Sequence, residues 1–539
     1  MAEAHSIAVP APSAVHAKLN KSPGAIGMII FAIVLIGGFA YAGFNLASDL
    51  EGGGHFQTIW PYVLLGVALL TALGFEFVNG FHDTANAVAT VIYTHSLEPH
   101  IAVVWSGMWN LIGVLTSSGA VAFTIISLLP VELILQVGHG AGFAMVFALL
   151  IAAILWNLGT WWLGLPASSS HTLIGSIIGV GLANQLMSPK GSGTSGVDWG
   201  QAAGVFRALL LSPVFGFVLA GGLLLLLKAV IKVPGLYKAP EGDAPPPFWI
   251  RALLILTCTG VSFGHGSNDG QKGMGLIMLI LIGTVPTVYA LNHAVGTGQV
   301  QDFAAVSQQA ASALGSHATP GVTSSDPRVD LTDFIRTKQI TPVTLTAAHD
   351  LALQISNSVT DAKSLAGIPA NQQQNVRNDM YVEGETLRLF AKTGKPDFSS
   401  SETAQLANYR KHIDTATKFI PNWVKVAVAL ALGLGTMVGW KRIVVTVGEK
   451  IGKDHLTYAQ GASAEIVAAV TIIAADQFHL PVSTTHVLSS GVAGTMLANG
   501  SGLQFATIRN IALAWVCTLP AAALLSATLF WTLNHFISH

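Results

Sequence analysis

GFHDTANA, residues 80–87, is a short polar stretch between apolar segments, and GSNDGQKG, residues 266–273, repeats its pattern 186 residues later. A second pair, LPASSSH at 165–171 and LPVSTTH at 480–486, also lies within apolar sequence. An internal duplication that carries ionisable residues at membrane depth is typical of a transporter whose site lies between two repeats. The two pairs therefore predict both the architecture and the place of the site.

The composition is that of an integral membrane protein. Of the 539 residues, 51% are hydrophobic and only 10% are charged, whereas soluble globular proteins carry about 25% charged residues. Mean hydropathy is +0.58. The net charge of −1 indicates no particular partner, and no basic stripe points to a nucleic-acid partner. Cys258 and Cys517 form neither a disulfide framework nor a metal-type spacing.

We predict an all-α polytopic membrane protein with about twelve apolar segments of spanning or near-spanning length. The polar residues 1–24 are expected to be a disordered tail, and the apolar segment after them is too long for a signal-peptide core, so it is expected to be a retained helix. Several segments are short and adjoin a polar motif, which favours broken helices or re-entrant hairpins. The segments are 25–46, 61–78, 101–129, 141–164, 170–186, 206–232, 249–265, 273–291, 423–447, 459–475, 484–498 and 508–533.

Residues 292–420 differ from the rest, because they are rich in Gln, Ser, Thr, Asp and Lys. We predict a soluble, partly helical insertion there, between membrane regions 25–291 and 421–539. The proline motifs are 315 residues apart, and the excess over the 186 residues between the Asp motifs equals the 129 residues of the insertion. The second repeat thus starts before the insertion and is completed after it. Whether the repeats are parallel or inverted depends on an odd or even helix count.

Two basic loops bear on orientation. One contains Lys228, Lys232 and Lys238, and the other runs from Lys441 to Lys453. The positive-inside rule favours both as cytoplasmic. Simple counting of spans puts both on one side only if a segment between them is re-entrant.

Asp83 and Asp269 are the central residues of the first motif pair. An Asp at the bilayer centre costs about 2.5–3.5 kcal/mol, so two in matching places predict a function. Asn86 lies on the same helix face as Asp83, and carboxylate and amide oxygens suit a proton or a hard cation. Nearby glycines are expected to let the backbone unwind. The alternative is that each Asp caps a helix end near the membrane interface.

The second copy of this motif is not identical to the first. Lys272 stands where the first copy has Asn86, and Asn268 stands where it has His82. A buried Lys272 would face an anion or pair with an Asp, or its side chain would snorkel to the interface. Glu465, in a small-residue stretch, is a further acid at membrane depth.

The proline motifs predict helix N-termini, since Pro ends the preceding segment and Ser or Thr caps the helix after it. Free N–H groups, the partial positive charge of the first turn and the hydroxyls together suit a tetrahedral oxyanion. Capping alone is the alternative explanation. His171 and His486 either titrate near neutral pH or only orient the helices. The hydroxyl residues are Ser168, Ser169, Ser170, Ser483, Thr484 and Thr485.

At residues 77–87, 262–273, both proline motifs and 439–448, the chain resembles the inorganic phosphate transporter (PiT) family. The resemblance implies inverted repeats, with the substrate between the two Ser/Thr helix starts and the two Asp motifs. It implies that Asp83, Asn86, Asp269, 168–170 and 483–485 hold phosphate. His82 and Lys272 depart from the usual signature and resemble the bacterial proton-coupled branch, which also takes divalent metal–phosphate complexes.

We therefore expect a phosphate symporter of the bacterial inner membrane, with no resident cofactor and no enzymatic activity. Two carboxylates beside an anion repel it, so a co-transported cation is required. Asp83, Asp269, Asn268, Lys272, His82 and Glu465 are the candidates for coupling. Sodium coupling, a Mg²⁺–phosphate substrate, another oxyanion such as sulfate or arsenate, a channel and a homo-oligomer remain open alternatives. An intramembrane hydrolase is disfavoured, because the duplicated Ser/Thr cluster offers no single nucleophile with a base in reach.

Overall fold

The structure is a computed structural model that describes residues 19–21, 24–53, 59–135, 140–188, 196–240, 242 and 244–537. The side chains of residues 52, 53, 84–86 and 537 lie outside this description. Most of the expected disordered tail, and the side chain of Asn86, therefore lie outside it too. The described residues form helices and no β-strand.

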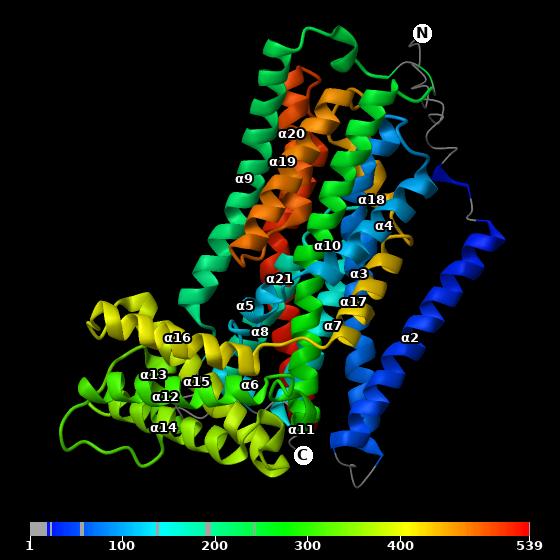
Figure 1. Cartoon of the computed structure of the whole chain (residues 1–539). Helices are drawn as coiled ribbons and strands as arrows, with labels where there is room; N and C mark the ends of the chain where they lie inside the picture. The colour runs from blue at the N-terminus through cyan, green and yellow to red at the C-terminus, as the bar shows by residue number, and fades with distance from the viewer. Residues whose placement is uncertain are drawn as a thin grey trace, which may run out of the picture.

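The first half of the chain is a helical bundle with one additional helix, α2, along its side (Figure 1). Asp49, near the end of α2, accepts hydrogen bonds from Tyr289 and Trp423 and so fixes this end of the helix to the bundle. The helices are α2 (Ala25–Gly53), α3 (Trp60–Tyr93), α4 (Pro99–Thr116), α5 (Ala120–Ile126), α6 (Val131–Leu135), α7 (Ala141–Trp162), α8 (Ser169–Met187) and α9 (Trp199–Val230).

The second half repeats this order of long helix, broken helix, helical hairpin and long helix. The short helix η1 (Pro234–Leu236) leads into it. Its elements are α10 (Phe248–Thr284), α17 (Asn422–Gly435), α18 (Lys441–Val445), the π-helix η3 (Thr446–Lys450), α19 (Tyr458–Gln477), α20 (Thr484–Asn499) and α21 (Phe505–Ile537).

The two repeats are inverted, because their first helices, α3 and α10, run antiparallel side by side (Figure 1). Glu76 of α3 lies against Gly273 of α10, whereas Thr90 of α3 and Thr257 of α10 both donate to Glu465. Residue numbers thus rise along one helix as they fall along the other. This inversion is the arrangement that the family resemblance implies.

The motif glycines do not unwind the backbone, so that expectation is wrong. Both α3 and α10 run unbroken through their Asp motifs. Gly80 faces the Leu432 carbonyl of α17, and Gly266 faces the Asn110 carbonyl of α4. An added Cβ at either glycine would overlap that carbonyl. The glycines therefore permit close helix packing at equivalent places in the two repeats.

The proline motifs lie in the turns of two helical hairpins, α7–α8 and α19–α20. Each hairpin packs its second helix against the last long helix of the other repeat, α8 on α21 and α20 on α9. Gly179 of α8 lies on the Ala523 carbonyl, and Gly494 of α20 lies on the Phe217 carbonyl. The hairpins enter the bundle from opposite ends, so their turns meet inside it (Figure 1).

The described residues contain fewer long apolar helices than the twelve segments of spanning or near-spanning length that the sequence predicts. Within the described residues, seven helices are long and apolar enough to cross a membrane, or up to nine if each of two bent helix pairs is one span. The expected segments 249–265 and 273–291 largely form the single helix α10. The polar motif interrupts hydropathy there without interrupting the helix.

Both basic loops lie at the end of α20. Lys228 Nζ donates to the Asn499 carbonyl, and the Lys453 N–H donates to Gly502, just beyond α20. Between the two loops the chain runs away along α10 and returns along α17. The positive-inside rule therefore favours one side for both loops.

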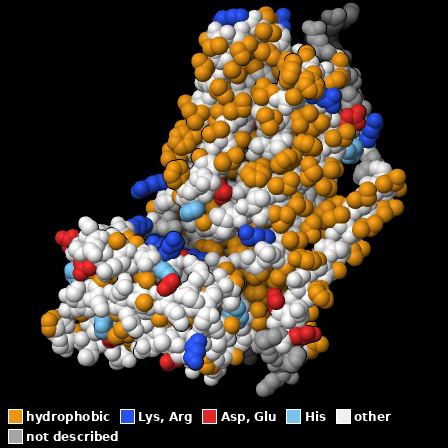
Figure 2. All heavy atoms as spheres, viewed as in Figure 1, with side chains coloured by type: hydrophobic (Ala, Val, Ile, Leu, Met, Phe, Trp, Pro, Cys, Tyr) orange, Lys and Arg blue, Asp and Glu red, His pale blue; other side chains and the backbone are white. Residues whose placement is uncertain are grey.

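Residues 292–420 fold into helices at the other end of the bundle (Figure 1), and their hydrophobic core also includes Val131, Ala290 and Leu291. On the face shown in Figure 2, hydrophobic side chains cover the bundle, and charged ones gather on the insertion, at its junction with the bundle and at the opposite end of the bundle. After α11 (Pro286–Tyr289), the insertion contains α12 (Thr297–Ser316), α13 (Pro327–Thr337), α14 (Thr344–Ala362), η2 (Leu365–Gly367), α15 (Ala370–Thr393) and α16 (Ser400–Thr417).

Candidate functional site

Asp83 and Asp269 face one buried group from the middles of α3 and α10. Their exposed fractions are 4% and 0%. Ser169 Oγ donates to Asp83 Oδ2 at 2.5 Å and lies 3.5 Å from Asp269 Oδ2. Neither Asp caps a helix end, so that alternative is excluded. The polar centre is the name used below for these two carboxylates and the side chains that contact them.

Two helix N-termini point at this centre, as the proline motifs predict. Ser168 is the N-cap of α8 and accepts the His171 N–H at 3.2 Å, and Ser483 is the N-cap of α20 and accepts the His486 N–H at 3.1 Å. Ser170 Oγ donates to the Val482 carbonyl at 3.0 Å, which joins the two turns. Capping explains Ser168 and Ser483, but it does not explain the other hydroxyls.

On the Asp83 side of the centre, the carboxylate has an imidazole and a hydroxyl as partners. His82 Nδ1 lies 2.9 Å from Asp83 Oδ1, and Thr485 Oγ1 of α20 donates to the same oxygen at 2.7 Å. His82 Nε2 lies 3.0 Å from Thr160 Oγ1 of α7. The imidazole thus links the Asp83 carboxylate of α3 to a hydroxyl of α7.

On the Asp269 side, the partner is an ammonium group. Lys272 Nζ donates to Asp269 Oδ1 at 2.5 Å and also to Ser170 Oγ. Lys272 has no exposed surface, so the snorkelling alternative is wrong. Among the hydrogen bonds of the described residues, none joins Asn268 to either carboxylate. Its amide donates to the Leu480 carbonyl at 3.1 Å and holds the turn of the second hairpin.

His265 is a site residue that the sequence predictions missed. It lies one helical turn before Asp269, which places it on the same face. Its Nε2 is 3.6 Å from Asp269 Oδ2 and is buried with no hydrogen bond to the described residues, while its Nδ1 lies 2.6 Å from Asn110 Oδ1. Asp83, His265 and Asp269 offer ligand atoms that all lie within 4.8 Å of one another.

This triad has the chemistry of a cation site. If Nδ1–H donates to Asn110, the Nε2 lone pair of His265 faces the carboxylates, as in a metal-ligating histidine oriented by an outer partner. Two carboxylate oxygens and one imidazole fit a proton or a divalent cation.

Thr484 and Glu465 are the two remaining predicted residues with described side chains. Thr484 Oγ1, in the first turn of α20, is buried and makes no hydrogen bond with the described residues. Glu465 lies outside the polar centre, because its partner Thr90 is seven residues, about 10 Å, along α3 from Asp83. Its carboxylate accepts from two threonines and contacts neither Asp.

Beside the centre, three aromatic rings stack at the hairpin turns. The centroids of His171 and His486 are 4.4 Å apart, and those of His486 and Trp515 are 4.1 Å apart. Trp515 Nε1 donates to the Pro166 carbonyl at 2.8 Å. The stack therefore fixes the two turns against α21.

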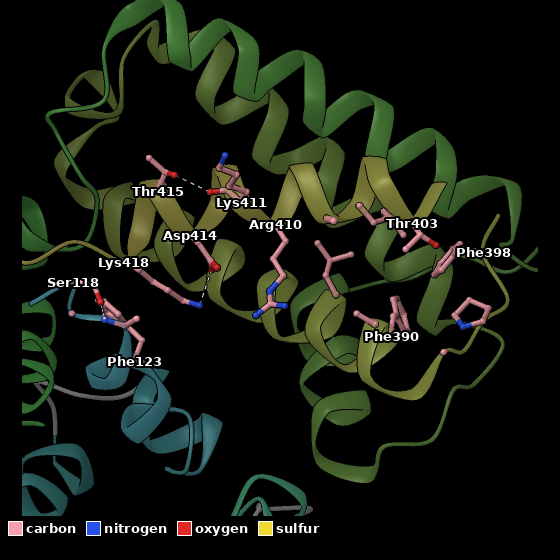
Figure 3. Close-up of a pocket in the computed structure, with 18 of the residues that line it drawn as sticks. Ser118, Phe123, Phe390, Phe398, Thr403, Arg410, Lys411, Asp414, Thr415 and Lys418 are labelled. Carbon is pink, nitrogen blue, oxygen red and sulfur yellow. Dashed lines mark hydrogen bonds and ion pairs between the residues drawn. The ribbon is translucent and has the colours of Figure 1, made fainter. Parts of the chain in front are cut away.

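A cavity also lies outside the polar centre. A cavity of about 720 Å³ lies between the insertion helices α15 and α16 and the start of α5 (Figure 3). Arg410 points into it, and Lys418 is paired with Asp414 at 2.7 Å. No residue of the polar centre lines this cavity, and the centre itself is closed to solvent.

Comparison with known proteins identifies the family of the chain that contains this buried centre. A family model described as "Phosphate transporter family" matches residues 79–526, a range that contains both hairpins and both Asp motifs. The chain belongs to the phosphate transporter family. Members of this family are transporters rather than enzymes, and the chain is a multi-pass membrane protein.

Several relatives match over nearly their whole length. The chain is 42% identical to the low-affinity inorganic phosphate transporters PitA and PitB of Escherichia coli (strain K12), over 88% of this chain and 97% of each relative. It is 28% identical to the probable low-affinity inorganic phosphate transporter of Bacillus subtilis, over 88% of this chain and 98% of that protein. A solved structure titled "The sodium-dependent phosphate transporter" is more distant, with 17% identity and a TM-score of 0.47 over 88% of this chain and 99% of that one.

Proposed function

We propose that the chain is a secondary transporter that moves inorganic phosphate across the bacterial inner membrane together with protons. The observation that carries the proposal is the meeting of two capped helix N-termini with two buried carboxylates at an inverted-repeat interface. The names of the 42% identical relatives support phosphate as the substrate.

Phosphate suits this centre because its oxygens need both donors and acceptors. The first turns of α8 and α20 offer N–H groups and a partial positive charge. Thr484 adds a hydroxyl that no described residue engages. Asp83 and Asp269 can accept from a protonated phosphate oxygen. Sulfate has no such proton near neutral pH, so the carboxylates favour phosphate or arsenate over sulfate.

Proton coupling is supported by the chemistry of the Asp83 side. A phosphate anion next to Asp83 and Asp269 needs positive charge nearby. His82, bonded to Asp83 and Thr160, can supply it by binding a proton and remove it by losing one. Sodium coupling is the alternative, and an imidazole is a poorer ligand for sodium than an oxygen donor.

A divalent metal–phosphate complex is a second form of the substrate that the centre suits. Asp83, His265 and Asp269 would face the metal ion of such a complex, and the helix N-termini would face its phosphate. The ion would travel as cargo and not as a resident cofactor.

Phosphate uptake into proteoliposomes tests the proposal, with proton, sodium and Mg²⁺ gradients imposed one at a time. We expect an inward proton gradient to drive wild-type uptake without sodium. Asp83→Asn and Asp269→Asn should each abolish uptake while the protein elutes as a single folded species. Asp269→Asn should be the less stable of the two, because removing one partner of a buried ion pair costs about 3–5 kcal/mol.

The matched control is Asp302→Asn, which changes an exposed Asp on α12 of the insertion. It should transport as wild type does. Uptake near the wild-type rate by either Asp83→Asn or Asp269→Asn would remove the carboxylates from the mechanism. Loss of labelled phosphate uptake in the presence of excess sulfate would favour a general oxyanion carrier.

A further inference from the structure

The hydroxyl–carboxylate contacts of the two repeats are equivalent in sequence but not in structure. Thr485 and Ser170 occupy matching positions of the two proline motifs, and Asp83 and Asp269 match in the Asp motifs. Thr485 of the second repeat donates directly to Asp83 of the first. The symmetric contact, from Ser170 to Asp269, is absent among the hydrogen bonds of the described residues.

Lys272 Nζ takes the place of that contact. It donates to Ser170 Oγ on one side and to Asp269 Oδ1 on the other, so an ammonium lies between hydroxyl and carboxylate. The oxygens around it are the kind of ligands that a hard monovalent cation takes. The side chain is wholly buried, which leaves the charge no route to water.

The two copies of the Asp motif differ at the position of this ammonium group. The first copy of the motif has Asn86, a neutral oxygen donor, at the position of Lys272. The first copy therefore has no lysine beside its Asp, and the described partner there is the imidazole of His82. The charged and titratable groups near Lys272 are Asp269 and Glu76 from α10 and α3, and His171 from α8.

We propose that the Lys272 ammonium is a built-in cation that fills, in the second repeat, a position that a diffusible monovalent cation would otherwise occupy. The proposal rests on the phosphate transport proposed above. The charge neutralises the Asp269 side in every step of the cycle, and it cannot leave with the substrate. Only the Asp83 side then has to gain and lose a cation. If both sides had to do so, each transported phosphate would need one more exchangeable cation.

Lys272→Asn tests this directly, because it gives the second copy the residue of the first. In proteoliposomes with an inward proton gradient and choline in place of sodium, we expect phosphate uptake to fall at least about tenfold, since a buried carboxylate loses its partner. Sodium should restore uptake with a saturable dependence. Wild-type uptake should be the same in sodium and in choline.

Two further measurements keep the test independent of that one readout. Sodium should raise the Tm of purified Lys272→Asn and leave that of the wild type unchanged, since a ligand stabilises the state that binds it. Lys272→Ala should regain uptake when ethylammonium is supplied. The matched control is Lys232→Asn, at an exposed lysine beyond α9, which should behave as wild type.

Wild-type uptake by Lys272→Asn without sodium would overturn the inference. So would folded Lys272→Asn and Lys272→Ala proteins that neither sodium nor ethylammonium stabilises or reactivates. Failure of the wild-type protein to transport phosphate would instead overturn the proposed function, and the Tm response to sodium would still be measurable.

Discussion

The two sides of the polar centre have the same scaffold and different chemistry. Asp83 and Asp269 lie at matching positions of antiparallel helices, and each faces a helix N-terminus from a hairpin. Asp83 has the imidazole of His82, whereas Asp269 has the ammonium of Lys272. The comparison teaches that packing symmetry can be kept while the charges diverge, so one side can hold a fixed cation and the other an exchangeable one.

Outside the polar centre, the largest effects are expected at the glycines that let helices of the two repeats pack closely. Gly80→Ala and Gly266→Ala each push a methyl group into the backbone of a neighbouring helix. Overpacking of this kind typically costs about 1–3 kcal/mol. Both variants should lower the Tm and phosphate uptake to similar extents, because the two glycines are equivalent.

Gly74→Ala, on α3 itself, is the control for this pair. A Cβ at Gly74 meets nothing within 4 Å, and Ala favours a helix by about 1 kcal/mol over Gly. Its Tm should equal or exceed that of the wild type. Tolerance of Gly80→Ala but not of Gly266→Ala would show that the packing is not symmetric.

The smallest effect is expected at the contact between the insertion and the first repeat. Asp198, the N-cap of α9, lies 3.2 Å from Lys338 Nζ and 3.5 Å from Arg388, both in the insertion. Burial raises the pKa of Asp198, but Lys338 and the Gln201 N–H outweigh it and hold the pKa below its usual value. Such a group stabilises the fold above its unfolded pKa, and the contribution is lost as the pH falls through the folded pKa.

Asp198→Asn should therefore lower the Tm by a small amount at neutral pH, equivalent to about 0.5–1 kcal/mol. Asn is as good an N-cap as Asp, so the loss reports the ion pairs. The Tm difference from the wild type should be constant from about pH 5 to 8 and shrink below about pH 4. A difference that does not change with pH would contradict the ion-pair account.

Local chemistry explains which site residues the sequence could predict. A Pro followed by Ser and Thr specifies a capped helix start wherever it occurs, so the turns at 166–171 and 481–486 were foreseeable. The repeat also identified Asp83 and Asp269 as partners. Both predictions need only neighbouring residues and the internal duplication.

Long-range packing explains what the sequence did not predict. Gly80 could either let α3 unwind or let another helix pack closely against α3. The contact with Leu432, which is hundreds of residues away, decides for close packing. His265 is recognised as a site residue only from its proximity to Asn110 and Asp83, which lie on other helices. The continuity of α10 was hidden because polar residues lower hydropathy without breaking a helix that other helices cover.

The exchangeable charge is expected on the Asp83 side, opposite the fixed charge of Lys272. The most direct test is to record proton entry and phosphate uptake together in proteoliposomes that contain wild type or His82→Asn, the residue found at the matching position 268. We predict that His82→Asn still exchanges internal for external phosphate but no longer responds to an inward proton gradient, whereas the wild type moves protons with phosphate. A His82→Asn protein that the proton gradient drives as strongly as the wild type would contradict the account.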